Sequence, residues 1–204
     1  MAAIDEIIRL NTHIAEFWSR ADGWAPADAA ELLSRARFDR QVSLSRTLRL
    51  WQPPTDAAES DGRLILAWTN LGALVEGTLK WFLCVFEHDY AKSPLVKRRG
   101  PTAGEPLEPD EPMLGELIDF YAEQVWTESE RDAWTAWLDM VRTQRNAIHA
   151  YQHRDVGDWA DFDRAVQRYR DLLLGLEGRA PYPDEYAYPA DIAEMHARAM
   201  RRAM

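Results

Sequence analysis

The chain has 204 residues, of which 47% are hydrophobic and 28% are charged, so it can bury a sizeable core as one domain. Its formal net charge of −10 at pH 7 excludes the broad basic surface of proteins that grip a long nucleic-acid backbone. The single cysteine, Cys84, excludes an intramolecular disulfide and favours a cytoplasmic protein. The first residues also lack the basic start and apolar run of a signal peptide.

Two helices are predicted before the first proline pair. Apolar residues from Ile4 to Trp18 recur with a helical period, and this stripe ends near Gly23. A second helix is expected to start at Pro26, a favoured first-turn residue, and to continue to about residue 51. The prolines at 53 and 54 then stop it, because proline cannot continue the hydrogen-bond ladder.

The third predicted helix is the most apolar segment of the chain. Asp61 is expected to cap it, and it should run from Gly62 to about Tyr90. Glu76 and Lys80 lie one turn apart near its middle. Two such charges argue for a buried core helix and against a membrane span.

Residues 91–112 form the longest predicted break, with five prolines and two glycines. The first half of this segment is basic and the second half is acidic. A connection of this length inside a compact domain is usually functional or disordered. Two interpretations stay open, namely a solvated linker and a flap that contacts a substrate or a partner.

The rest of the chain is also predicted to be helical. Thr127 followed by Glu130 is a capping-box pattern, and Asp158 is the expected cap of a later helix. Helices are expected at 113–125, from 128 into the polar segment 142–155, at 159–176 and at 189–202. The fold prediction is all-α, a bundle of four or five long helices. One domain should span 1–178, and 179–204 should be an extension with a short helix.

The polar segment near residue 145 carries the candidate chemistry. On a continuous helix, Arg142, Arg145 and His149 would lie along one face, with Asn146 at its border. This places two permanent cations beside a group that titrates near neutrality. A phosphodiester attacked by its own 2′-hydroxyl needs such a set, since the imidazole moves the proton and the guanidinium holds the charge on the phosphoryl oxygens.

The segment Arg145-Asn146-Ala147-Ile148-His149-Ala150-Tyr151 resembles the signature of the HEPN superfamily. Many members of that all-α, four-helix-bundle superfamily are metal-independent endoribonucleases of toxin–antitoxin, phage-defence and CRISPR systems. In active members an Arg, a polar residue directly after it and a His four to six residues beyond the Arg meet at a dimer interface. That spacing counts the residues between the Arg and the His. Only three residues separate Arg145 from His149 here, one fewer than the usual minimum, whereas six separate Arg142 from His149, which is an allowed spacing but without an Asn directly after the Arg.

The resemblance implies a cytoplasmic homodimer that cleaves RNA without a metal or cofactor and leaves a 2′,3′-cyclic phosphate and a 5′-hydroxyl. His149 would be the general acid/base, and Arg145 with Arg142 would stabilise the phosphorane. Asn146 would orient the reacting groups. Tyr151 and Arg154 are the candidate substrate-binding residues. An antitoxin or defence-system protein is the implied partner.

Alternative interpretations of the same residues also stay open. The cluster could belong to a HEPN-like interaction or ligand-sensing module without catalysis, or be a polar helix end in which cations favour the helix dipole. His149 and His153, with Asp155, have a spacing that suits zinc. Glu76 is expected either to pair with Lys80 on the surface or to face the arginine cluster across the core. The remaining histidines, His13, His88 and His196, are expected to be isolated surface residues, and the basic end at Arg198, Arg201 and Arg202 either complements a helix dipole or contacts RNA.

Overall fold

The computed structural model describes residues 2–99, 104–149, 151 and 154–203. The described chain is helical without a strand, and its only β-type pairing is an isolated bridge between Arg98 and Pro106. The α-helices are α1 (Ala2–Trp18), α2 (Ala27–Arg35), α3 (Phe38–Thr47), α4 (Ser60–Val85), α5 (Glu87–Lys92), α6 (Leu114–Gln124), α7 (Glu128–Arg145), α8 (Trp159–Glu177) and α9 (Ala190–Ala203). The all-α prediction is therefore confirmed.

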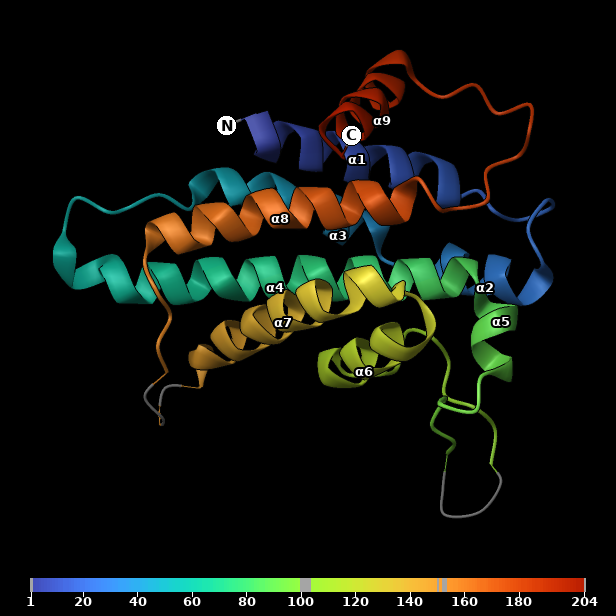
Figure 1. The fold of residues 1–204 in the computed structure, drawn as a ribbon, viewed down its shortest axis with the longest axis horizontal. Coiled ribbons are helices and arrows are strands. Elements are labelled where there is room, and N and C mark those ends of the chain that lie inside the picture. Colours follow the sequence, from blue (N-terminus) through green and yellow to red (C-terminus); the bar gives the residue numbers. More distant parts are fainter. Residues whose placement is uncertain (1, 100–103, 150, 152–153, 204) are drawn as a thin grey trace.

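Helix α4 lies at the centre of the molecule. It packs against α7 and α6 on one side and against α8, α2 and α3 on others, while α1 covers α3 and α8 (Figure 1). Buried side chains occur on every face of α4, including Trp68, Leu71, Leu74 and Leu79, which explains its weak apolar periodicity. No helix in the described part of the chain is long and apolar enough to cross a membrane.

Two predicted helices are interrupted. The helix expected over 26–51 breaks at Ala36, whose backbone is extended (ψ of 137°), and at Arg37, whose ψ of 60° is not helical, so α2 and α3 are separate. The helix expected over 62–90 begins earlier, and Asp56 rather than Asp61 caps the 3-10 turn in front of α4. It also kinks at Phe86, where α5 starts in a new direction. No proline or glycine lies at either break, so packing between helices, and not local helix propensity, determines where the two breaks occur.

The caps of the later helices confirm their sequence predictions. The Glu130 carboxylate accepts a hydrogen bond from the backbone N–H of Thr127 at 3.2 Å. The Asp158 carboxylate accepts a hydrogen bond from the Asp161 N–H at 2.8 Å, and the Asp161 carboxylate accepts one from the Asp158 N–H at 2.9 Å. These pairs fix the starts of α7 and α8, the two helices that carry the polar features described below.

The described parts of the 91–112 segment form a hairpin rather than an unstructured linker. The Arg99 N–H donates to the Glu105 carbonyl at 2.9 Å, and the Leu107 N–H donates to the Lys97 carbonyl at 2.8 Å. The basic half also pairs with acidic residues, because Arg99 contacts Glu111 at 2.7 Å. The charge reversal along this segment therefore holds its two arms together.

Candidate functional site

The polar segment leaves the α-helix earlier than predicted. Helix α7 ends at Arg145, and Asn146–Ile148 form a 3-10 turn in which the His149 N–H donates to the Asn146 carbonyl at 3.2 Å. His149 itself has φ −84° and ψ 79°, which is not helical. The predicted single helical face for Arg142, Arg145 and His149 is therefore wrong at His149. No proline or glycine lies at the end of the helix, so no local signal predicts that the helix ends there.

Arg145 is the anchored member of the cluster. Its guanidinium donates a hydrogen bond to the Glu76 carboxylate on α4, and Lys80 contacts the same carboxylate at 2.8 Å. The alternative in which Glu76 faces the arginine cluster is thus confirmed for Arg145 but not for Arg142, and Glu76 also makes the expected pair with Lys80. A Cβ atom at Gly72 would lie 2.8 Å from Cβ and 2.5 Å from Cδ of Arg145, so only glycine allows this approach of α7 to α4.

The Glu76 carboxylate stays ionised in this environment. Burial opposes its ionisation, but the hydrogen bonds from Lys80 and Arg145 outweigh burial and lower its pKa. The two cations and one carboxylate leave a local excess of one positive charge. That charge lies beside the turn that carries Asn146, at a site about one-third exposed at Arg145.

Arg142 points to different neighbours from Arg145. It contacts Asp139, one turn earlier on α7, at 2.9 Å, and its Cδ lies 3.7 Å from where a Cβ on Gly115 of α6 would be. Both partners of this ion pair are exposed, so it contributes little to stability. Arg142 is thus an exposed, adjustable cation, while Arg145 is a fixed one.

The side chains after the helix end are open to solvent. His149 is exposed, Ile148 is 43% exposed and Tyr151 is fully exposed. Asn146 and Arg154 are half-buried. The structure thus brings Arg145, Asn146 and His149 to one helix end, with Arg142 one turn away, and places Tyr151 on the loop beyond.

The metal interpretation gains no geometric support. His153 lies outside the described residues, and the helix that would have aligned it with His149 ends before both. Asp155, the third ligand considered, accepts a hydrogen bond from the Gly157 N–H at 2.9 Å. Among the described residues, no group of three or more His, Cys, Asp or Glu side chains is placed to hold a metal ion.

A second polar centre was missed by the sequence analysis. His13 of α1 is 2% exposed, Glu177 at the end of α8 is 0% exposed, and His196 of α9 lines a pocket beside them. The Nε2 atom of His196 shares a hydrogen bond with Glu177, and Nε2 of His13 lies 3.2 Å from the other carboxylate oxygen. The prediction that His13 and His196 are isolated surface residues is therefore wrong.

The buried carboxylate is held in its charged form. Burial opposes the ionisation of Glu177, but His13 and His196 outweigh burial and lower its pKa to about 2. Tyr182, Tyr186 and Tyr188 pack around the His13 ring with centroid distances of 5.6 to 5.9 Å. One signal was present in the sequence, because His13 falls three residues after Leu10 on the apolar stripe of α1.

No protein-family model, curated protein or solved structure matches the chain. The likeness to the HEPN superfamily remains the resemblance carried by residues 145–151 and by the helical pattern around them.

Proposed function

We propose that this protein is a metal-independent endoribonuclease of the HEPN type, with its site at the end of α7. The observation that carries the proposal is the fixed Arg145 guanidinium beside the turn that presents Asn146 and the exposed His149. A positioned guanidinium next to an accessible imidazole is the minimum set of groups for catalysing attack of an RNA 2′-hydroxyl on the adjacent phosphodiester.

The proposed reaction uses only side chains of the chain. His149 takes the proton of the 2′-hydroxyl, and the freed oxygen attacks phosphorus as the bond to the 5′-oxygen breaks. The products are a 2′,3′-cyclic phosphate and a 5′-hydroxyl that has gained a proton from an imidazolium. Arg145 and Arg142 stabilise the charge on the non-bridging oxygens, and Asn146 orients the substrate. Two copies of the chain provide two imidazoles, one as base and one as acid.

The dimer is proposed to form through α7 and the loop after it. Ile148 and Tyr151 are exposed on either side of His149, and an apolar and an aromatic side chain at a charged surface are typical of a contact site. Tyr151 and Arg154 would contact the RNA strand once the second copy closes the site. An antitoxin or defence-system partner would compete for the same exposed surface.

Purified protein incubated with single-stranded RNA in EDTA tests the proposal. We expect cleavage with 2′,3′-cyclic phosphate ends, and His149→Ala should reduce the rate by about 100-fold or more, as for loss of a general acid/base. His88→Ala is the matched control, since His88 is also exposed and lies on α5. Equal rates for His149→Ala and wild type would remove the assigned role, and cleavage only after metal addition would favour the metal-dependent class.

A second candidate is a HEPN-like interaction module without catalysis. The observation that favours it is the pairing of Arg145 with Glu76, which already occupies part of the guanidinium. Wild-type protein that is dimeric by analytical ultracentrifugation yet cleaves no RNA would support this candidate. Ile148→Glu should then abolish the dimer, whereas Leu66→Glu, at another exposed apolar residue, should leave it intact.

A further inference from the structure

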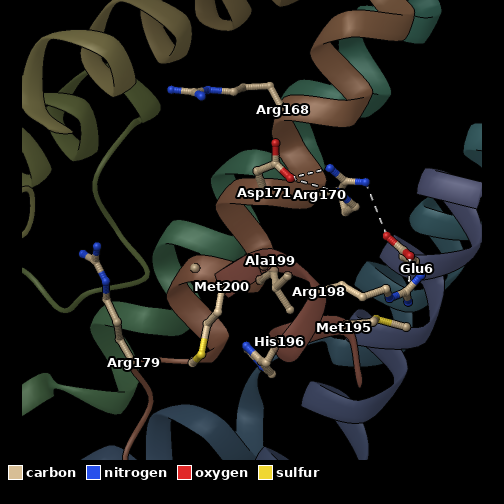
Figure 2. Close-up of a pocket in the computed structure, with 13 residues that line it drawn as sticks. Glu6, Arg168, Arg170, Asp171, Arg179, Met195, His196, Arg198, Ala199 and Met200 are labelled. Atoms are coloured by element: carbon tan, nitrogen blue, oxygen red, sulfur yellow. Dashed lines mark hydrogen bonds and ion pairs between the residues drawn. The ribbon is translucent and has the colours of Figure 1, made fainter. Parts of the chain in front are cut away.

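A pocket of about 630 Å³ lies between α8 and α9, next to the first helix (Figure 2). Four arginines line it, three of them from α8 and the residues just after it and one from α9: Arg168, Arg170, Arg179 and Arg198. Among the residues that the structure describes, His196 also lines the pocket, and the carboxylates that line it are Glu6 and Asp171. A pocket with excess positive charge is unusual on a chain with a net charge of −10.

The two carboxylates form ion pairs with the arginines on one side of the pocket. Glu6 lies 3.1 Å from Arg198 and 3.5 Å from Arg170, and Asp171 contacts Arg170 at 2.6 Å. Arg170 is held by both acids and is only 18% exposed, so it forms part of the wall. These pairs also explain the basic end of α9 in part, because Arg198 docks that helix onto α1.

The other side of the pocket holds cations that the pocket's own carboxylates do not neutralise. Figure 2 shows Arg168 of α8 and Arg179, two residues after the end of α8, on the side of the pocket away from Glu6. The Arg168 guanidinium lies 3.9 Å above the ring of Trp134 and contacts no carboxylate among the described residues. Arg179 pairs with Glu130 of α7, outside the pocket, and its guanidinium carbon is 5.7 Å from the centre of the Trp126 ring.

These contacts fix the two guanidiniums before any ligand arrives. Trp134 and Trp126 are stacked on each other with centroids 5.6 Å apart, so each arginine is held against its own member of the pair. Arg168 is therefore a positive group without a carboxylate partner among the described residues, and Arg179 is a second positive group that a phosphate would share with Glu130. Arginine forks match phosphate oxygens, and side chains that are already ordered lose little entropy on binding.

The floor of the pocket is apolar. Leu174 of α8 and Met195, Ala199 and Met200 of α9 line it, and methionine adapts well to a planar ring. Gly175 leaves open space, because a Cβ atom there would meet nothing within 4 Å. The volume is in the range of small-molecule sites.

We propose that this pocket binds a nucleotide that carries two or more phosphate groups. The phosphates lie along Arg168 and Arg179, and the base rests on the methionine side of α9. His196 is held by Glu177 and lies against Gly178, so it lines the pocket at the end of α8. A small polyphosphate suits a limited cationic pocket on an acidic body, whereas a long RNA would also meet the repulsion of the surrounding charge.

The site is separate from the proposed ribonuclease site. Arg179 contacts Glu130 in the first turn of α7, whereas Arg145 is its last residue, about 22 Å away along the helix axis. Nucleotide binding therefore requires neither RNA cleavage nor dimer formation, and Arg145→Ala should leave it unchanged.

Isothermal titration calorimetry of the full chain with ADP in EDTA tests the proposal, with adenosine as the ligand without phosphates. We expect ADP to bind and adenosine not to, and Arg168→Gln and Arg179→Gln each to weaken ADP binding by about tenfold or more. Arg164→Gln is the matched control, because Arg164 lies one turn from Arg168 on α8, pairs with Asp161 and is not among the described residues that line the pocket. Gly175→Met keeps every charge and should block binding by filling the open space.

Three results would overturn the proposal. They are the absence of ADP binding at millimolar concentration, equal affinity in wild type and the Arg168→Gln/Arg179→Gln variant, and binding of a single-stranded oligonucleotide without binding of ADP. Thermal unfolding of each variant shows that it is folded before titration. If ADP does not bind, the ribonuclease proposal is unaffected, because His149 plays no part in nucleotide binding.

Discussion

Replacing Gly72 by alanine tests how closely α4 and α7 approach at the candidate site. The added Cβ would lie 2.8 Å from Cβ and 2.9 Å from Cγ of Arg145. Because the Arg145 Cβ is fixed to the backbone of α7, the side chain cannot simply rotate away, and the two helices must separate. Gly175→Ala on α8 is the matched control, since its new Cβ meets open space.

The magnitude follows from two opposing effects. Overpacking a close interface costs about 1–3 kcal/mol, and more where backbone must move. Alanine in place of glycine inside a helix contributes about 1 kcal/mol of stability. Because the two helices must separate, the upper part of that cost, about 2–3 kcal/mol, applies at Gly72. We therefore expect Gly72→Ala to lower the free energy of unfolding by about 1–2 kcal/mol and Gly175→Ala to raise it by about 1 kcal/mol.

Urea unfolding followed by tryptophan fluorescence measures both variants, and the midpoints should move in opposite directions at an unchanged m-value. For a chain of this size the corresponding shifts in Tm are about 2–4 °C per kcal/mol. If Gly72→Ala is stabilised as much as Gly175→Ala, the close approach is not present and the anchoring of Arg145 by α4 is refuted.

Three further predictions concern buried polar groups. Because the pKa of Glu177 is lowered to about 2, the stability it contributes is present above pH 5 and lost as pH falls towards 2, by about 3 kcal/mol in total. The stability difference between wild type and Glu177→Gln should shrink over that window in urea titrations. Asn70→Ala should cost about 2–3 kcal/mol, since Asn70 accepts hydrogen bonds from Trp51 at 2.7 Å and Thr47 at 3.0 Å. Burial raises the pKa of the Cys84 thiol to about 12, so a thiol reagent should label it only as fast as the protein unfolds.

Each of these predictions has a result that contradicts it. A constant stability difference from pH 5 to pH 2 would mean that the pKa of Glu177 is the same in the folded and unfolded protein, so that His13 and His196 do not lower it. An Asn70→Ala variant as stable as wild type would show that Trp51 and Thr47 find other acceptors. Labelling of Cys84 at the rate of a free thiol, in protein that is folded by circular dichroism, would show that the α4 core is open there.

The features of the fold that could be predicted from the sequence are those determined by residues within one helical turn of each other. The starts of α7 and α8 were predictable because Thr127, Glu130 and Asp158 make their bonds within one turn. The break between α2 and α3 was not, because no residue at 36 or 37 forbids a helix and the bend is set by packing on α4. The same reason explains why the early end of α7 was missed.

The candidate site was predicted only in its residue types. Arg145, Asn146 and His149 do gather at a helix end, but the role of Gly72 in admitting Arg145 depends on a contact between helices 73 positions apart. The arginine pocket could not be found from the sequence. Its members come from α1, α8 and α9, and no motif links Glu6 to Arg168 or Arg198.

The shared carboxylate of Glu177 also constrains when the protein can complete its fold during synthesis. His13 leaves the ribosome early, Glu177 follows much later, and His196 later still. Until residue 196 has emerged from the exit tunnel, the nascent chain carries a charged carboxylate in its core with only one of its two imidazole partners. The interior around α1 and α8 therefore closes late in translation, and slowing the ribosome before that codon should prolong the exposure of that core to chaperones and proteases.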